Sequence, residues 1–376
     1  MELTEYELGQ LLTYEQPTAY IVESTEYNEN YKTPVLTAGK SFVLGYTNET
    51  ENIFDKLPVI IFDDFTTSTQ YVNFKFKVKS SAMKILHINT ELVNPKYIYY
   101  RMQTIQFDHS THKRYWIQQY SKLKVQIPPL VEQERIVAKI EELFSDLDNA
   151  VETLNATKAK LEVYRQAVYA SIYDYNNVRP ITDFFEVTGG LTKNSKRNTL
   201  PKKMPYLRVA NVYFNMLDLS EIKEIGVNEQ EIEKCLLKKN DLLFVEGNGS
   251  KSQIGRVAIW DGSIENCLHQ NHLIKARPLG NMIPAYALFY LISGGGRKQI
   301  NEVSKSTSGL YTLSTNKVRE LMIPYCDYEK QQQGVDEIES RLSVCKSIEE
   351  TVDTALQQAT AMRQSILKQA FEGRLL

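Results

Sequence analysis

The side chains with the clearest catalytic potential form the tetrapeptide Asn94-Pro95-Lys96-Tyr97. It is similar to the Asn-Pro-Pro-Tyr motif of amino-methyltransferases, but Lys96 replaces the second proline. No glycine-rich cofactor loop after a strand accompanies it. A turn before a helix accounts for these residues better, because Asn-Pro pairs favour the start of a turn. We therefore expect no methyltransferase site in this chain.

Two segments imitate a phosphate-binding loop, and both lack a required residue. Gly39-Lys40-Ser41 has the end of the motif, but Pro34 stands where the first glycine is needed. In residues 247–252, Ser250 precedes Lys251, which reverses the order of the motif. Both segments are better explained as loops than as nucleotide sites.

The histidines and cysteines do not form a metal site. Four of the five histidines come in two pairs, at 109 and 112 and at 269 and 272. A zinc site needs about four ligands, and no cysteine or carboxylate cluster supplies the others at the usual spacing. Core packing or hydrogen bonds to a binding partner explain the histidines better. No Ser-His-Asp set or carboxylate pair can be assigned either, so we expect no catalysis, no metal and no bound cofactor.

Composition is that of a soluble protein of two or three domains. The 376 residues are 42% hydrophobic and 24% charged. The four cysteines have no CxxC spacing, which fits a reducing cytoplasm. The start MELTEYELGQ lacks the plan of a signal peptide, and no apolar run is long enough for a membrane span. The sequence therefore predicts a cytoplasmic protein without a membrane partner.

The net charge of −2 argues at first against a nucleic-acid partner, since such domains are usually basic. The charges are unevenly distributed, however. Acidic residues are in excess between 132 and 152, and basic residues concentrate between 75 and 84 and between 193 and 203. The average charge is thus a poor guide to the surface of each domain.

A long helix between residues 127 and 174 organises the chain. Apolar side chains recur every seventh residue at Ile140, Leu147, Leu154, Leu161 and Val168, which is the pattern of a coiled coil. No glycine or proline interrupts the helix after the proline pair at 128 and 129. From about residue 134 to 173 it would be roughly 60 Å long.

This helical segment is duplicated. When Gln133 is aligned with Gln331, the offset of 198 residues holds without a gap and places Arg165-Gln166 on Arg363-Gln364. Each copy follows an Ile-Pro pair. The second copy departs from the pattern at Gly334, near its start. A long-period repeat gives the order globular half, helix, globular half, helix.

The two globular halves share an order of parts. In the first half, residues 59–86 indicate two strands with a polar loop between them, followed by a short helix over 95–106. In the second half, residues 240–245 take the place of the first strand and 285–290 that of the short helix. The segment 33–46 aligns with 204–217, while the contents of the loops differ. Separate specificities on one scaffold would produce this pattern.

Three segments of the sequence are distinctive: IPPLVEQERIVAKIEELFSDLD, the ending SILKQAFEGRLL, and YLRVANV (residues 206–212). They are similar to recurring segments of the specificity subunits of Type I DNA restriction-modification systems, a family that the chain resembles. The resemblance implies two target-recognition domains, each reading half of a split site in double-stranded DNA. It also implies two docked modification (methyltransferase) subunits, which would carry the S-adenosylmethionine, and restriction subunits that join for cleavage.

Together the repeat and the resemblance predict an α+β fold with an internal pseudo-twofold repeat. Two mixed α/β target-recognition domains would occupy residues 1–125 and 177–322. Two long antiparallel coiled-coil helices would occupy 126–176 and 323–376 and separate the domains. One turn of duplex advances about 34–36 Å, so helices of this length could set the unread spacer between the half-sites.

DNA recognition requires cations for phosphates and hydrogen-bonding side chains for base edges, and these are expected on loops. In the first half the candidates are Thr66, Thr67, Ser68, Thr69, Gln70, Lys84, His112, Lys113, Arg114 and Tyr115. In the second half they are Lys193, Asn194, Ser195, Lys196, Arg197, Asn248, Gly249, Ser250, Lys251, Ser252, Gln253, Arg256, His269, Gln270 and Asn271. Arg208 and Asn211 are further candidates, for which a scaffold role is an equal alternative.

The helices have two possible uses. They could join two copies of the protein, or they could pair within one chain and offer a second surface to modification subunits. The duplication favours the internal pair, because each helix already has its partner. Apolar residues left over, such as Phe144, Tyr169 and Phe371, are the expected subunit interface. A stand-alone DNA-binding or coiled-coil protein and an enzyme with a degenerate site remain the alternatives.

Overall fold

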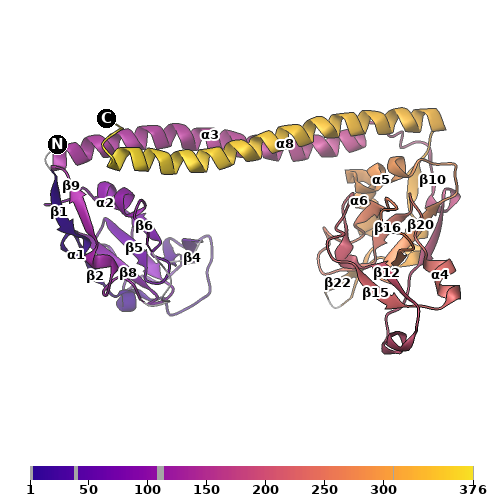
Figure 1. Ribbon diagram of the computed structural model, residues 1–376, viewed down its shortest axis with the longest axis horizontal. Helices are drawn as coiled ribbons and strands as arrows, with labels where there is room; N and C mark the ends of the chain where they lie inside the picture. The colour runs from indigo at the N-terminus through magenta and orange to yellow at the C-terminus, as the bar shows by residue number, and fades with distance from the viewer. Residues whose placement is uncertain (1–2, 38–40, 108–113, 308, 376) are drawn as a thin grey trace. The chain divides into compact units, whose positions relative to one another are not determined.

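The computed structural model describes residues 3–37, 41–107, 114–307 and 309–375. The chain forms two compact units (Figure 1). Unit 1 comprises residues 1–154 and 353–376, and unit 2 comprises 155–352. The long helices α3 (Leu130–Ala170) and α8 (Tyr328–Phe371) therefore contribute one half each to both units. The globular part of unit 1 precedes α3 in the sequence and that of unit 2 precedes α8, as the repeat predicts.

Unit 1 contains two main sheets and a two-stranded ribbon. The ribbon is β1-β9, and the sheets have the orders β2-β8-β5-β6 and β4-β3-β7. The strands are β1 (Thr4–Glu7), β2 (Leu12–Glu15), β3 (Thr33–Leu36), β4 (Val43–Thr47), β5 (Val59–Asp63), β6 (Thr69–Val72), β7 (Lys77–Val78), β8 (Met83–Ile88) and β9 (Lys124–Ile127). The helices of this part are α1 (Leu8–Leu11) and α2 (Pro95–Met102), with short 3-10 turns at Pro17–Tyr20 and Tyr120–Lys122.

Unit 2 repeats this topology. The ribbon β10-β23 matches β1-β9, the sheet β11-β20-β16-β18 matches β2-β8-β5-β6, and β15-β12-β19 matches β4-β3-β7. In both three-stranded sheets the middle strand has one antiparallel and one parallel neighbour. The matched strands are β10 (Val178–Pro180), β11 (Phe185–Gly189), β12 (Lys203–Leu207), β15 (Lys223–Gly226), β16 (Leu242–Val245), β18 (Val257–Ile259), β19 (Leu268–His269), β20 (Leu273–Pro278) and β23 (Met322–Pro324).

Unit 2 also has elements of its own. Small sheets are formed by β13 (Val212–Tyr213) with β14 (Met216–Leu217), and by β17 (Gly247–Asn248), β22 (Leu310–Thr312) and β21 (Lys305–Thr307). The helix α5 (Pro284–Ile292) matches α2 of unit 1. The other short helices are α4 (Glu229–Cys235), α6 (Gly294–Val303) and α7 (Thr315–Arg319), and 3-10 turns lie at Ile181–Asp183, Ser195–Thr199 and Val209–Asn211. The additional strands belong to loops, where the two halves of the sequence differ most.

The segment 59–86 differs from the prediction of two strands. Its apolar run forms β5, whose four residues Val59 to Phe62 are fully buried. Three further strands follow β5. The residues between 63 and 69 separate it from β6, those between 72 and 77 separate β6 from β7, and those between 78 and 83 separate β7 from β8. β5 is central in its sheet, so both of its faces are covered and its sequence is apolar throughout.

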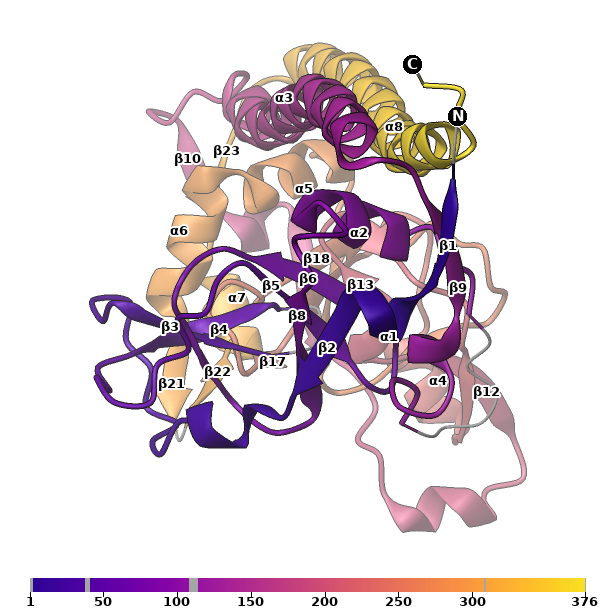
Figure 2. The same cartoon turned by 90° about the vertical axis from the view of Figure 1, so that its left-hand side faces the viewer.

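The short helices α2 and α5 lie between the sheets and the long helices. In unit 1 the core joins Ile60 and Phe62 of β5, Ile98 of α2, Ile140 of α3 and Leu367 of α8. Figure 2 shows α2 between the strands of this unit and the long helices. The equivalent core of unit 2 joins β16, α5 and both long helices. Each globular domain is thereby packed on its own half of the helix pair.

The long helices run antiparallel within each unit. In unit 2, Ile172, just beyond the end of α3, lies beside Gly334 near the start of α8. Arg165, which comes before Ile172 in the chain, pairs with Glu349, which comes after Gly334. A Cβ at Gly334 would lie 2.7 Å from Ile172 Cδ1, so glycine allows the helix backbone to approach. The departure from the repeat at Gly334 is therefore a packing requirement.

The seam of the helix pair follows the heptad pattern. Ile140, Val168 and Ile338 are buried, and the intervening positions are buried or half-buried. Ala150 and Tyr164, which stand at alternate positions of the heptad pattern, are exposed. Within the described residues no helix is both long and apolar enough to cross a membrane.

Candidate nucleic-acid interface

In unit 1 the candidate segment 66–70 forms the end of the β5-β6 hairpin. The side chain of Asp63 accepts two backbone N–H groups of the turn, at 2.8 and 3.2 Å. Thr67 has φ of +57°, the left-handed conformation that closes the turn. Thr66 and Ser68 are exposed, and Thr67, Thr69 and Gln70 are half-buried, the last two as part of β6. The hairpin therefore presents short hydroxyl side chains on a fixed backbone.

Asp64 joins a second candidate segment to this hairpin. Its carboxylate accepts the backbone N–H of Trp116 at 2.8 Å, and its carbonyl oxygen accepts that of Tyr115 at 3.0 Å. The ammonium of Lys84 lies 3.6 Å from the same carboxylate, and both side chains are at most 3% exposed. Lys84 thus neutralises a buried carboxylate that holds two loops together.

This arrangement corrects two of the predicted DNA contacts in unit 1. Lys84 is 2% exposed and Tyr115 is 1% exposed, so neither side chain can reach a bound duplex. Arg114 is exposed directly beside them. His112 and Lys113 lie outside the described residues. The structure brings together the hairpin and Arg114, and their contact with DNA stays a prediction.

In unit 2 the basic segment 193–197 has a mixed outcome. Lys193, Asn194, Ser195 and Lys196 are exposed around a 3-10 turn. Arg197 is buried, and its guanidinium makes a bidentate ion pair with Glu231 at 2.6 and 2.9 Å. It also donates to two backbone carbonyls, so it fastens the segment to α4. The predicted DNA contact of Arg197 is wrong for this reason, because its donors are already occupied.

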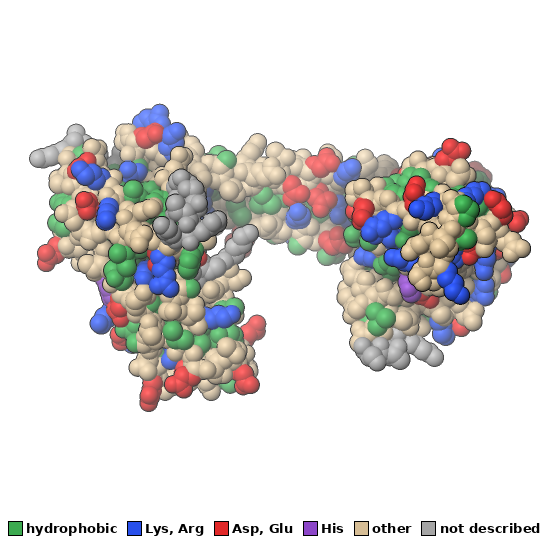
Figure 3. Space-filling model, turned by 60° about the horizontal axis from the view of Figure 1, so that its bottom comes forward, with side chains coloured by type: hydrophobic (Ala, Val, Ile, Leu, Met, Phe, Trp, Pro, Cys, Tyr) green, Lys and Arg blue, Asp and Glu red, His purple; other side chains and the backbone are tan. Residues whose placement is uncertain are grey.

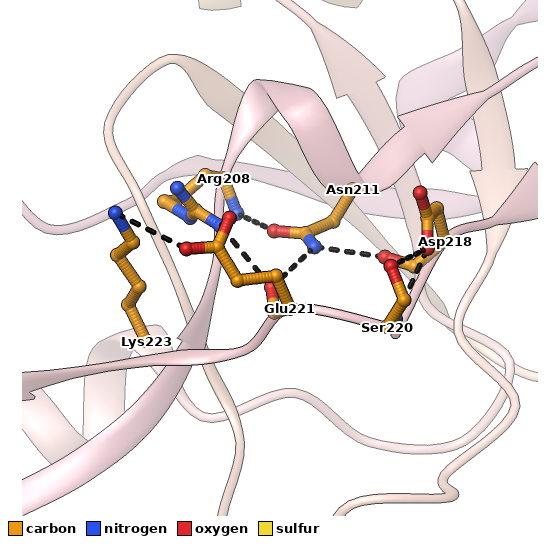
Figure 4. A network of polar contacts seen from close by, with 6 residues as sticks. All are labelled: Arg208, Asn211, Asp218, Ser220, Glu221 and Lys223. Atoms are coloured by element: carbon orange, nitrogen blue, oxygen red, sulfur yellow. Dashed lines mark hydrogen bonds and ion pairs between the residues drawn. The ribbon is translucent and has the colours of Figure 1, made fainter. Parts of the chain in front are cut away.

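Arg208 and Asn211 build the loop that follows β12 (Figure 4). The amide nitrogen of Asn211 donates to the carbonyl oxygens of Asp218 (2.8 Å) and Glu221 (3.1 Å), and its amide oxygen accepts the N–H of Arg208. The Arg208 guanidinium donates to the Glu221 carboxylate at 3.1 Å and, with Lys223, lowers the pKa of that carboxyl. Asn211 is 3% exposed, so its role is structural and the predicted base contact is corrected.

The segment 248–253 is the most accessible of the candidates. Gly249, Ser250, Lys251 and Ser252 are exposed, whereas Asn248 and Gln253 are half-buried. The Asn248 side chain accepts the N–H of Ser250 at 2.9 Å, and the backbone of Asn248 pairs with Tyr311 of β22. Lys251 thus stands at the tip of a turn whose base is held by a strand.

Arg297 of α6 fixes the other end of this turn. Its guanidinium donates to the carbonyl oxygens of Ser252 (3.2 Å), Ile254 (2.7 Å) and Gly255 (3.2 Å). It also lies over the ring of Phe214, 4.8 Å from the centroid. Burial lowers the pKa of Arg297 to about 10, which leaves it charged at neutral pH. Arg297 is not among the predicted contacts, because a lone arginine after three glycines carries no signal in the sequence.

Arg256 lies just beyond the same turn. Its guanidinium stacks over Tyr213 at 4.8 Å and donates to the carbonyl oxygen of Val209 at 3.3 Å. The side chain is half-buried. A cation held against an aromatic ring at the edge of the loop can meet a phosphate with little loss of side-chain freedom. Its contact with DNA stays a prediction.

His269 is fully buried in β19 and does not face DNA. Its Nδ1 lies 2.9 Å from the carbonyl oxygen of Cys235. Burial, with a smaller effect from the nearby Lys275 ammonium, lowers the pKa of His269 to about 3. The predicted contact is therefore wrong, because the neutral ring belongs to the core. Gln270 and Asn271 follow on the turn to β20 and are half-buried, so only these two remain candidates.

The expected partner-interface residues are more enclosed than predicted. Phe144 is 5% exposed, and the guanidinium carbon of Arg363 lies 4.2 Å from the centroid of its ring. Tyr169 packs on Phe289, and Phe371 packs edge-on against Tyr97. Phe144 is thus corrected to a core residue. Tyr169 and Phe371 are half-buried and line cavities within their own units.

Basic side chains stand among acidic ones on the face of both units that Figure 3 shows. Within the part of the chain that the structure describes, no group of three or more His, Cys, Asp or Glu side chains is placed to hold a metal ion. The site geometry consists of exposed loops held by charged residues, such as the buried Asp64 and the half-buried Arg297. Such an arrangement is suited to recognition by shape and hydrogen bonding.

The family model for the Type I restriction modification DNA specificity domain matches residues 2–163 and again residues 174–358. The chain belongs to this family. The two matches fall on the two topological repeats, so each repeat is one specificity domain with its helix.

Relatives and solved structures of the specificity family cover the chain. It is 30% identical over 365 residues to the EcoR124I/EcoR124II specificity subunit of Escherichia coli, across 91% of this chain and 87% of the relative. It is 26% identical to the EcoKI specificity subunit of Escherichia coli strain K12, across 68% of this chain and 58% of the relative.

Two solved structures share the fold at 14% identity. One chain, from a study of complex assembly and conformational transition of the type I R-M system, has a TM-score of 0.71 and covers 99% of this chain and 98% of its own length. The HsdS subunit from Thermoanaerobacter tengcongensis has a TM-score of 0.53, with 99% and 97% covered.

Proposed function

We propose that this chain selects the DNA site of a Type I restriction-modification complex and carries out no chemistry itself. The observation that carries the proposal is the duplicated specificity domain with unlike loops. The sheets, the short helix and the long helix recur in both units, whereas the exposed turns at 63–69 and 248–253 differ in sequence and in anchoring. Each unit would read one half of a split site in double-stranded DNA.

The reading surfaces would be formed by exposed and half-buried candidates that remain after the corrections. In unit 1 these are the β5-β6 hairpin and Arg114. In unit 2 they are residues 193–196, 249–252, Arg256 and the turn at 270–271. Lysine and arginine side chains would bind phosphates, and hydroxyl and amide groups would meet base edges.

The partners follow from the same proposal. Two modification subunits would bind the chain, one for each repeat, and they would carry the S-adenosylmethionine and the methyl-transfer chemistry. Restriction subunits would join the same complex for cleavage. The helix pair would set the length of the unread spacer, because α3 connects the two recognition domains in the sequence and α8 packs against it.

The experiment that tests the proposal is methylome sequencing of a host that expresses the cognate modification subunit, with and without this chain. A split adenine-methylation motif that appears only with the chain is the expected result. A folded complex that produces no new motif would contradict the proposal and favour a stand-alone DNA-binding or coiled-coil protein.

Exchange of one recognition domain tests whether each unit reads its own half of the site. Replacing residues 177–322 by the equivalent domain of another specificity subunit should change one half of the methylated motif and leave the other half intact. A change in both halves would contradict the assignment of one half-site to each unit. Equal heptad insertions in both long helices should lengthen the spacer without changing either half.

A further inference from the structure

Two cavities occupy equivalent places in the two units. In unit 2 a cavity of about 590 Å³ lies between the C-terminal half of α3 and the segment that follows α5. In unit 1 a cavity of about 460 Å³ lies between the C-terminal half of α8 and the segment that follows α2. Gln166 and Gln364 line them, and these two residues are related by the repeat offset of 198.

The second wall of each cavity confirms the equivalence. The helices α2 and α5 both begin with a proline, Pro95 and Pro284. Counting from these prolines places Ile105 on Gly294, and these residues line the unit 1 and unit 2 cavities respectively. The same surface has therefore been kept in both copies, although the exposed turns of the two units have diverged.

The chemistry of the two linings also matches. Each contains one aromatic side chain from a long helix, Tyr169 or Phe371, beside its glutamine. Each contains two cations and one glutamate, so the formal charge of each lining is 2 − 1 = +1.

One cation in each cavity has no acidic partner among the contacts of the described residues. Arg165 is paired with Glu349, and Lys368 lies 3.9 Å from Glu372. Arg297 instead donates to backbone carbonyls and stacks on Phe214, as described above. Arg101 donates to the Thr104 hydroxyl at 2.9 Å and lies 5.4 Å from the centre of the Phe371 ring. Each cavity thus offers a partly buried positive charge next to an aromatic ring.

We propose that the two cavities are paired docking sites for one acidic and apolar segment of the modification subunit, one copy in each unit. This inference rests on the proposed function. A carboxylate of the segment would meet Arg297 or Arg101, and an adjacent apolar side chain would pack on Tyr169 or Phe371. Two identical partners require two like surfaces on one chain, which the repeat supplies.

DNA fits these cavities less well than an acidic protein segment. A glutamate lines each of them, Glu162 in unit 2 and Glu372 in unit 1, and it would repel a phosphate chain. The two half-sites would also require unlike surfaces, whereas these cavities are alike.

Filling the cavities tests the docking. Gln166 and Gln364 are exposed on their helices, so Gln166→Trp and Gln364→Trp can occupy the cavities with little effect on folding. We expect native mass spectrometry with purified modification subunit and no DNA to show two bound subunits for the unsubstituted chain. Each single variant should bind one subunit and the double variant none. Gln357→Trp, at an exposed position of α8 that lines neither cavity, is the matched control and should bind two.

A charge series at the same positions tests the kind of segment. Glutamate at 166 and 364 should weaken binding of the modification subunit about three-fold, and lysine should strengthen it by a similar factor. Equal effects of glutamate and lysine would overturn the acidic segment. If the double tryptophan variant still binds two modification subunits, the cavities are not the docking sites. The same conclusion would follow if the tryptophan variants changed DNA binding and left the binding of modification subunits unchanged. The methylome of the unsubstituted chain reports separately on the proposed function, so the two failures are distinguishable.

Discussion

Gln133 and Gln331 make the same connection in the two units. Both side chains are fully buried, and each amide oxygen accepts the backbone N–H of the residue that caps a short helix, Asn94 at 2.7 Å and Ile283 at 2.8 Å. Each amide nitrogen donates to a carbonyl oxygen just before its long helix, at 2.8 Å in both units. One glutamine therefore locks a recognition domain to its half of the helix pair.

Replacing this glutamine should destabilise the protein. In Gln331→Ala the buried N–H of Ile283 and the carbonyl oxygen of Cys326 lose their partner, and an unsatisfied buried group costs about 1–3 kcal/mol. Urea unfolding followed by circular dichroism measures the loss. The neighbour Gln332 is exposed and bonds only to Asp336, so Gln332→Ala is the control and should change stability by less than about 0.5 kcal/mol. Equal losses in both variants would contradict the locking role.

The Arg297 contacts predict that the turn at 250–255 depends on this residue. Arg297→Lys keeps the charge but loses the planar guanidinium that reaches three carbonyl oxygens at once. Amide hydrogen exchange in the turn should become faster by about ten-fold or more, corresponding to about 1.4 kcal/mol of lost local stability. The methylated motif should become degenerate in one half only.

Lys298→Gln is the matched control for Arg297, because Lys298 is the next residue and is exposed on α6. It should leave the exchange of the turn and the motif unchanged. A normal motif in Arg297→Lys, despite faster exchange, would show that the turn at 250–255 does not read DNA.

Lys251 provides a test of phosphate binding. Its side chain is exposed at the tip of the turn, so Lys251→Gln should weaken binding of DNA by the complex with modification subunits. Loss of one phosphate contact should lower the slope of log affinity against log salt by about 0.9. The exposed Lys346 on α8 gives the control Lys346→Gln, which should preserve the slope. An unchanged slope in Lys251→Gln would remove Lys251 from the interface.

His269 makes the stability of unit 2 depend on pH. Its folded-state pKa is about 3, below the value of 6.5 for an unperturbed histidine, so between these values the unfolded chain binds the proton and the folded chain does not. The contribution of His269 is fully present above pH 6.5 and declines by about 1.4 kcal/mol per pH unit as the pH falls toward 3. His269→Gln should lack this decline.

Denaturant unfolding of both proteins at several pH values between 7.5 and 4.5 measures the difference. At pH 7.5 the proteins should differ by a constant amount that reflects packing and the contact with Cys235. The difference in their free energies of unfolding should then shift in favour of the variant as the pH is lowered. Parallel curves would show that His269 titrates similarly in both states.

The sequence by itself determined the plan of the molecule. The heptad residues from Ile140 to Val168 predicted a long helix, because helical periodicity is local in the sequence. The offset that aligns Gln133 with Gln331 predicted a second helix and a repeated domain, because a duplication is visible when the sequence is aligned with itself. They also predicted which strand and short helix of one half correspond to those of the other. These patterns depend on spacing along the chain, which a sequence displays directly.

The tertiary structure alone decided which polar residues are accessible. Lys84, Arg197 and His269 were predicted from the sequence to contact DNA, yet all three are buried. Lys84 pairs with Asp64 and Arg197 with Glu231, and His269 contacts the backbone of Cys235 in the core. Conversely, Arg297 anchors a turn more than 40 positions earlier in the chain. Burial and pairing depend on contacts between distant segments, and residue type does not reveal them. The fold therefore separates the cations that hold the loops from the cations that the loops present.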